Sequence, residues 1–205
     1  MRRLSVAFSC VFTLLAWLPV ARAEEATDLL FFSGDLMTAR SYGGVGWLHA
    51  ASGLDFSGPV FSAELGRPEL GLGYGQAAAG WRFVQSGVYL TLLAGVEVDP
   101  EDAPVLNPLA SADLWWEPAK DWMTSAQIQA TPEYVSWRAA VGLRPADNWP
   151  WIGPEAGSDA GEPRAGLHAT GLRLTGGFEA RVSVGVAWWC GRPGPYGEIS
   201  VWRRF

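Results

Sequence analysis

The sequence has no long apolar run after its first 23 residues, although 49% of its 205 residues are hydrophobic. A helix that spans a bilayer needs about 20 consecutive apolar residues, so a helical membrane protein is excluded for residues 24–205. A membrane barrel is not excluded, because each of its strands needs only about 9 to 11 residues, with every second side chain facing lipid.

Positive charge and cysteine are also scarce. Lys120 is the only lysine, and the net charge of −6 has the wrong sign for a nucleic-acid-binding surface. Only Cys190 lies outside the N-terminal apolar stretch, so the mature chain cannot form an internal disulfide. No His, Cys and acidic residues have metal-ligand spacing, and the glycine-rich segment 71–75 is not followed by a phosphate-binding helix pattern. We therefore predict no metal, no cofactor and no nucleic-acid partner.

Residues 1–23 have the pattern of a cleavable secretory signal peptide. Two arginines precede an almost wholly apolar stretch from Ser5 to Val20, and Ala21-Arg22-Ala23 is a small-x-small cleavage site. A membrane anchor is the alternative, but the stretch is short for a span, and Pro19 before the small residues favours cleavage. Cleavage would remove three arginines and lower the net charge from −6 to about −9.

Alternation of apolar and polar residues dominates the rest of the chain. The segment 178–189 reads FEARVSVGVAWW, so one face is apolar and the other carries small, polar and charged residues. A helix, with its period of 3.6, would mix the two sets. Turn signals separate the predicted strands, which are 28–37, 43–50, 59–66, 72–84, 87–98, 108–117, 121–131, 133–144, 150–157, 163–173, 177–189 and 195–205. The pattern predicts an all-β fold: an antiparallel outer-membrane-type β-barrel of about 12 strands (roughly 10–12), formed by residues 24–205 as one domain.

An even number of strands places both ends of such a barrel on the periplasmic side. The alternate connections then face outward, and they include the two most acidic ones, 99–103 and 157–162. Several inward connections, such as 84–87 and 175–177, are short. A count of twelve strands thus places the acidic connections outside and the short ones on the periplasmic side, which favours that count.

The last strand ends in Phe205, and a terminal aromatic residue after an alternating strand is typical of the signal for outer-membrane assembly. Arg203 interrupts the apolar face of Ile199 and Val201, and its long side chain could reach the membrane interface. Phe205 is thus the predicted assembly signal.

Tryptophan is abundant, with 12 copies, and several lie near the ends of predicted strands. These are Trp115, Trp116, Trp122, Trp149, Trp151, Trp188 and Trp189. Aromatic girdles of membrane barrels occupy such positions, and the alternative is packing in the core of a soluble barrel. We favour the girdle.

Residues with a potential for chemistry are few. His168 should face inward beside Ser183, which leaves a Ser/His hydrolase on the barrel wall as one hypothesis and a structural histidine as the commoner outcome. The candidate lumen-lining residues are Asp113, Arg138, His168, Glu179 and Arg181. Trp115 and Trp189 are candidates for stacking against sugar rings, with girdle packing as the alternative. No catalytic residue and no metal ligand is assigned.

Several glycine-rich segments resemble the cellulose biosynthesis protein BcsS family. They are Trp151–Ala156, Arg164–Leu174, Gly176–Glu179 and Gly197–Phe205, together with Phe32–Asp35, Gly43-Gly44 and Trp47 near the start. The resemblance covers most of the mature chain and is strongest after Trp151. It implies an outer-membrane component of bacterial cellulose synthesis and names no catalytic residue.

Together with the barrel pattern, the resemblance implies a non-enzymatic outer-membrane accessory of cellulose and exopolysaccharide production or export. Its expected partners are outer-membrane lipid, a glucan chain and cellulose synthase components. A small outer-membrane hydrolase that uses His168 and a soluble periplasmic β-barrel binding module are the alternatives. A barrel of about 12 strands is narrow, so the sequence leaves open whether it conducts a glucan or anchors and organises the machinery.

Overall fold

A computed structural model describes residues 25–37, 41–68, 73–99 and 105–205 of the chain. The predicted signal peptide therefore lies outside the described residues. Within the described ranges, no helix is both long enough and apolar enough to cross a membrane.

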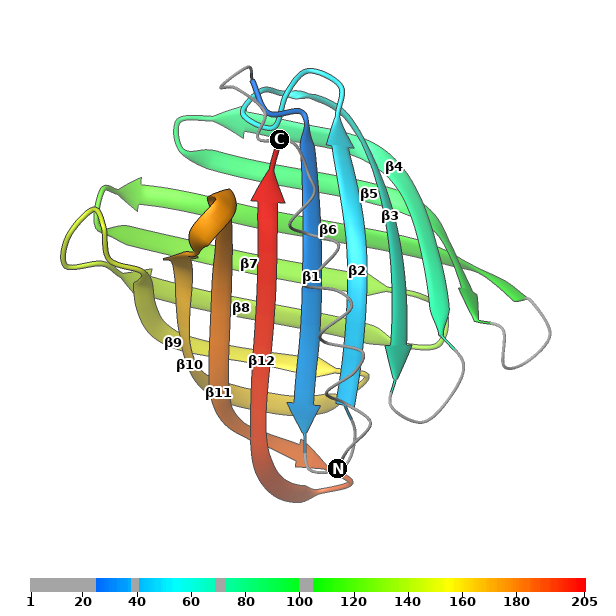
Figure 1. The fold of residues 1–205 in the computed structure, drawn as a ribbon. Helices are drawn as coiled ribbons and strands as arrows, with labels where there is room; N and C mark the ends of the chain where they lie inside the picture. Colours follow the sequence, from blue (N-terminus) through cyan, green and yellow to red (C-terminus); the bar gives the residue numbers. More distant parts are fainter. Residues whose placement is uncertain (1–24, 38–40, 69–72, 100–104) are drawn as a thin grey trace.

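The architecture is a closed barrel of twelve antiparallel strands, which confirms the predicted fold (Figure 1). The strands are β1 (Asp28–Met37), β2 (Ser41–Ala50), β3 (Gly58–Pro68), β4 (Tyr74–Gln85), β5 (Val88–Asp99), β6 (Val105–Ala119), β7 (Trp122–Ala130), β8 (Val135–Leu143), β9 (Trp151–Asp159), β10 (Glu162–Arg173), β11 (Phe178–Trp189) and β12 (Arg192–Arg204). A single 3-10 turn, η1 (Thr175–Gly177), joins β10 to β11.

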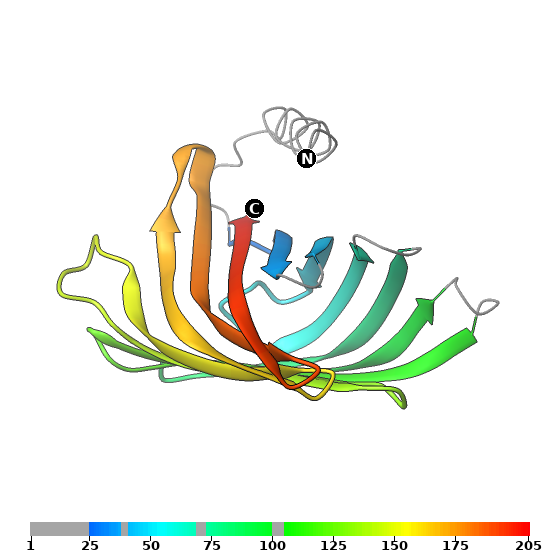
Figure 2. The same ribbon diagram turned by 90° about the horizontal axis from the view of Figure 1, so that it is seen from below.

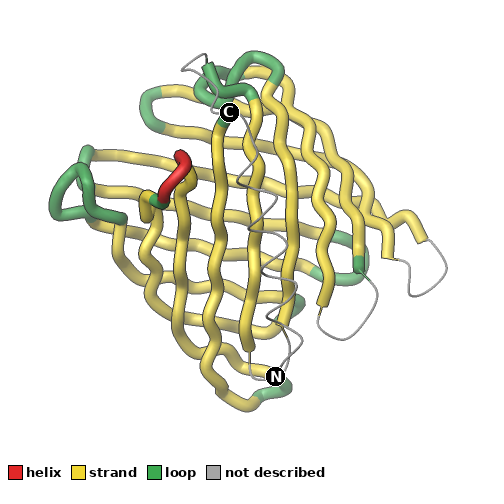
Figure 3. The backbone as a smooth tube through the Cα atoms, viewed as in Figure 1, coloured by secondary structure: helices red, strands yellow, loops and turns green. Residues whose placement is uncertain are grey.

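Each strand pairs with its neighbours in sequence, and β1 closes the sheet against β12 from Leu29↔Arg204 to Met37↔Tyr196. The front strands β1, β2 and β12 cross the rear strands β5 to β8 at a steep angle, as expected for strands tilted in a barrel (Figures 1 and 2). The connections gather at two opposite ends (Figure 3). We call the end where β1 begins and β12 ends the terminal end, and the other the distal end.

The two faces of the wall differ in chemistry as the alternation predicted. In β11, Val182, Val184 and Val186 are exposed on the outside, whereas Arg181 and Ser183 are buried on the inside. The same outward exposure of large apolar side chains recurs around the barrel, at Val45, Phe61, Leu65, Leu92, Val96, Ile128, Val141, Leu167 and Ile199. The apolar surface thus lies outside and the polar groups inside, the reverse of a soluble barrel.

The tryptophans divide between the two faces. Trp116 and Trp122 are exposed on the outside near the terminal end, and Trp188 near the distal end, as a girdle requires. Trp115 and Trp151 instead line the interior cavity, so their assignment to the girdle was wrong. The reason is strand phase: in a strand, neighbouring residues such as Trp115 and Trp116 must point to opposite faces.

One predicted acidic loop is a tight turn. Residues 157–162 were expected to form an outward connection, but β9 and β10 extend into it and leave Ala160 and Gly161 at the tip. Both tip residues have positive φ, 49° and 86°, which suits a two-residue hairpin turn. Of the other acidic connection, Asp99 ends β5 and 100–103 lie outside the described residues.

At the terminal end, the loop Ala51–Ser57 between β2 and β3 folds back toward the interior, and we call it the inward loop. Its Leu54 is only 2% exposed and packs with Leu48, Ala50 and Val60. Arg82 donates to the Leu54 carbonyl at 2.8 Å, and Arg204 pairs with Asp55 at 2.5 Å. These contacts hold the loop partly across the terminal mouth.

Candidate functional site

The barrel encloses a cavity of about 620 Å³, lined by inward side chains of many strands. Of the predicted lumen residues, Asp113, Arg138, Glu179 and Arg181 line this cavity, as does the predicted stacking residue Trp115. His168 and Trp189 are not part of its lining. These five residues face the interior because side-chain direction follows strand phase.

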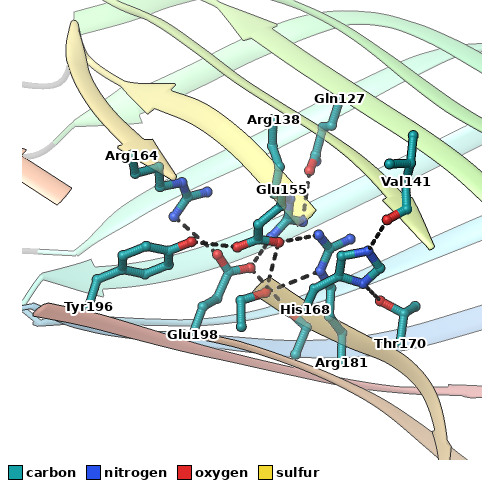
Figure 4. Close-up of polar contacts among 12 residues, drawn as sticks. Gln127, Arg138, Val141, Glu155, Arg164, His168, Thr170, Arg181, Tyr196 and Glu198 are labelled. Atoms are coloured by element: carbon teal, nitrogen blue, oxygen red, sulfur yellow. Dashed lines mark hydrogen bonds and ion pairs between the residues drawn. The ribbon is translucent and has the colours of Figure 1, made fainter. Parts of the chain in front are cut away.

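One side of the wall carries a network of buried ion pairs (Figure 4). Arg181 of β11 bonds to Glu155 of β9, which also accepts hydrogen bonds from Ser183 at 2.9 Å and Tyr196 at 2.6 Å. Three groups donate to this carboxylate and one of them is the Arg181 cation, so the two charges compensate each other despite their burial.

The network continues around Glu198 of β12. Arg138 of β8 bonds to one Glu198 oxygen, and Arg164 of β10 lies 3.1 Å from the other. Arg164 is also 3.6 Å from Asp35 of β1, across the closure of the sheet. The ion pairs thus join β8, β10, β12 and β1, which rigidifies this wall.

A second polar cluster, nearer the distal end, occupies β2 to β5. The hydroxyls of Tyr42 and Tyr74 contact each other and donate to Glu64 at 2.9 Å and 3.2 Å. Glu97 accepts from Gln76 at 2.6 Å and from Tyr134, in the β7–β8 connection, at 2.8 Å. Both carboxylates are therefore held by neutral donors, which leaves their charge in the lumen uncancelled by these partners.

Two tryptophans meet on the wall of the cavity. The rings of Trp115 (β6) and Trp151 (β9) lie edge to face, with 5.4 Å between their centroids. Gly142 of β8 makes room for Trp151, because a Cβ there would lie 2.9 Å from the Trp151 Cβ. The guanidinium of Arg144 stacks 4.1 Å above Trp151, and the Trp115 indole N–H donates to Glu117 at 2.9 Å. We call Trp115, Trp151 and Arg144 the aromatic shelf.

The side chain of His168 in β10 forms a hydrogen bond to the backbone of β8. Its Nε2 lies 3.0 Å from the Val141 carbonyl, which can only accept, so Nε2 carries the proton and donates. Its Nδ1 is then free to accept from the Thr170 hydroxyl at 2.8 Å. The pairing of β8 with β9 is interrupted beside Val141, at the level of Pro154, which has no N–H to donate. His168 thus donates a hydrogen bond to the Val141 carbonyl at the position where Pro154 has no backbone N–H to donate.

The geometry does not assemble a Ser/His pair at this position. Ser183 is the register partner of His168, but its hydroxyl donates to Glu155. Both ring nitrogens of His168 have other partners, and its side chain is 2% exposed. Within the ranges that the structure describes, no group of three or more His, Cys, Asp and Glu residues could hold a metal ion.

The core of the ion-pair network is formed by four residues that were not predicted from the sequence, Glu155, Glu198, Arg164 and Asp35. Glu155 had a usable signal, since it alternates with Gly153 and Gly157 on the inward face of β9. The remaining predicted residue, Trp189, lies at the distal rim beside the turn into β12, far from the aromatic shelf along the strand direction.

Comparison with solved structures supports the fold. The KdgM porin in complex with disordered oligogalacturonate has a TM-score of 0.63 at 10% identity, covering 86% of this chain and 99% of the porin. The NanC porin has a TM-score of 0.54 at 8% identity, covering 84% of this chain and 98% of the porin. At such low identity the likeness concerns the fold alone.

Comparison by sequence gives the family. No curated protein matches this chain. A family model for the cellulose biosynthesis protein BcsS matches residues 72–205, which is more than half of the chain and includes β4 to β12. The chain therefore belongs to the cellulose biosynthesis protein BcsS family.

Proposed function

We propose that this protein is a non-enzymatic barrel of the bacterial outer membrane that assists cellulose biosynthesis or export. The observation that carries the proposal is a closed barrel with an apolar outside and a polar cavity inside, in a chain of a cellulose biosynthesis family. The terminal end would face the periplasm, as both ends of the strand order lie there.

The outer surface supports a membrane location. A side chain such as Leu65 or Leu167 is more than half exposed, and placing many such groups in water would be costly. Outward tryptophans lie near both ends of the strands, where headgroups would accommodate an amphipathic ring. Lipid is therefore the partner that this surface fits best, and a soluble periplasmic barrel fits it poorly.

The interior supports a passive role. Two buried carboxylates of the interior, Glu155 and Glu198, are engaged by arginines, and His168 is engaged by the backbone. A general acid or base must instead reach a substrate proton. The cavity is suited to admit a polar chain, and the KdgM porin, a barrel of similar fold, is described in complex with an oligogalacturonate.

Deletion of the protein in a cellulose-producing host tests the proposal. We expect less cellulose outside the cells, measured as glucose released from the washed polymer, with unchanged synthase activity in inner-membrane vesicles. A wild-type copy should restore the polymer. A copy that lacks residues 2–23 is the matched control, because it encodes the same barrel but should stay in the cytoplasm. Unchanged amount and location of cellulose after deletion would overturn the proposal.

A further inference from the structure

The terminal half of the cavity combines aromatic rings with polar groups. Trp115 and Trp151 of the aromatic shelf line it on one side, and Phe31 of β1 and Trp202 of β12 line it as well. Asp113 and Gln127 lie on the same wall, and both are exposed to the cavity. A pyranose ring needs this combination, because its C–H face packs on an aromatic ring while its hydroxyls need hydrogen-bond partners.

The charges on the cavity wall balance. Six arginines and six carboxylates line the cavity, so the lining has no net charge. Several of the arginines are already engaged: Arg138 by Glu198, Arg181 by Glu155 and Arg204 by Asp55. A polyanionic sugar would have to displace these carboxylates to gain a cation. A neutral sugar would not, so the electrostatics of the lining favour a neutral chain.

We propose that the aromatic shelf is a subsite for a neutral glucan, with the exposed part of Trp115 as its stacking surface and Asp113 and Gln127 as hydrogen-bond partners. The inference rests on the proposed function, since cellulose is a neutral glucan and the chain belongs to a cellulose biosynthesis family. Arg144 covers one face of Trp151 and so fixes the orientation of that ring, which leaves Trp115 as the ring that meets the sugar.

The strand itself offers a matched control. Trp115 and Trp116 are consecutive in β6, but Trp115 lines the cavity whereas Trp116 is exposed on the outer surface. Substituting either removes one indole from the same strand, and only one of the two lies inside. Trp115→Phe keeps an aromatic ring and guards against a Trp115→Ala variant that fails to fold.

The test uses the purified full-length barrel in lipid bilayers, with cellohexaose and a hexamer of galacturonate added separately, and reads the interruption of ion current. We expect cellohexaose to interrupt the current and the acidic hexamer to do so at least tenfold more weakly. Trp115→Ala should weaken the cellohexaose effect by about 3- to 10-fold, as one aromatic contact contributes. Trp115→Phe should retain most of it, and Trp116→Ala should match the wild type.

Three results would overturn the inference. They are no effect of cellohexaose on the wild-type barrel, an equal or stronger effect of the acidic hexamer, or an equal loss in the Trp115→Ala and Trp116→Ala variants. Any of these leaves the deletion phenotype untouched, so the proposed role in cellulose production would stand or fall separately. Conversely, unchanged cellulose in the deletion strain would remove that role even if cellohexaose binds.

Discussion

Val184 and Ser183 are consecutive residues of β11 that face opposite sides of the barrel wall. Val184 is 56% exposed on the outside, whereas Ser183 is 1% exposed and hydrogen-bonded to Glu155 on the inside. In a lipid bilayer, the exposed valine would contact hydrocarbon near the middle of its strand. This pair therefore reports directly on which side of the wall is lipid and which is lumen.

Val184→Arg is the first prediction. A charge near the bilayer midplane is poorly solvated, so the substitution should lower the free energy of unfolding by about 2 to 4 kcal/mol in lipid vesicles, measured by urea titration. Ser183→Arg is a poor control, because the structure shows Ser183 packed in the ion-pair network. Gln127→Arg is better, since Gln127 is exposed to the cavity and touches the network only at its margin, through a 3.3 Å hydrogen bond that it accepts from Arg138. Equal tolerance of Val184→Arg and Gln127→Arg would contradict the assignment of faces.

The second prediction concerns the ion pair between Arg181 and Glu155. Glu155→Ala would leave a buried guanidinium without its carboxylate and should lower the free energy of unfolding by about 3 to 5 kcal/mol. Because Arg181→Ala removes the cation, the double variant should lose clearly less than the sum of the two single variants. Additive losses in the double-mutant cycle would show that the two side chains do not interact.

How far these features could be predicted depends on how local their signals are. The alternation of residues 178–189 is local, and it gave the correct faces of β11 without any partner. The facing of Trp115 and Trp116 depends on the phase of β6, and a tryptophan doublet carries no phase of its own. The phase comes from Asp113, two residues before Trp115, because residues i and i+2 of a strand share a face.

The partners of the ion-pair network are set by register, which no single strand encodes. Glu155 of β9 meets Arg181 of β11 across β10, and Arg164 reaches Asp35 across the closure between β12 and β1. Alternation placed Arg138 and Arg181 on the inside but could not choose their carboxylates. Leu54 had no signal either, because loops carry no periodic pattern.

His168→Ala is the third prediction and addresses the hydrolase alternative. The substitution removes the donor to the Val141 carbonyl, which should lower the free energy of unfolding by about 1 to 3 kcal/mol. Cellulose output per inserted barrel should remain near that of the wild type. His168→Gln, which retains a donor group, is the control for stability. Loss of cellulose output from His168→Ala with normal insertion would instead make His168 a candidate catalytic residue.

Deletion of Phe205 is the fourth prediction. Its backbone joins the start of the barrel, with its N–H donating to the Asp28 carbonyl at 2.9 Å and its carbonyl accepting from the N–H groups of Thr27 and Asp28. The loss of sheet area is small, but the terminal aromatic is absent, so we expect a large drop in inserted barrel with a normal precursor level on immunoblots. Phe205→Tyr retains an aromatic ring and should insert. Normal insertion of the deletion variant would show that Phe205 is not the assembly signal.

The most direct test of the account is where the mature protein resides and how it migrates. Membranes are separated on a density gradient, and each fraction is run on a gel with and without boiling, because a closed barrel resists unfolding by detergent until heated. We predict recovery with the outer membrane, extraction only by detergent, and a band that shifts on boiling. Recovery as a soluble periplasmic protein without detergent would contradict the membrane barrel on which the proposed function depends.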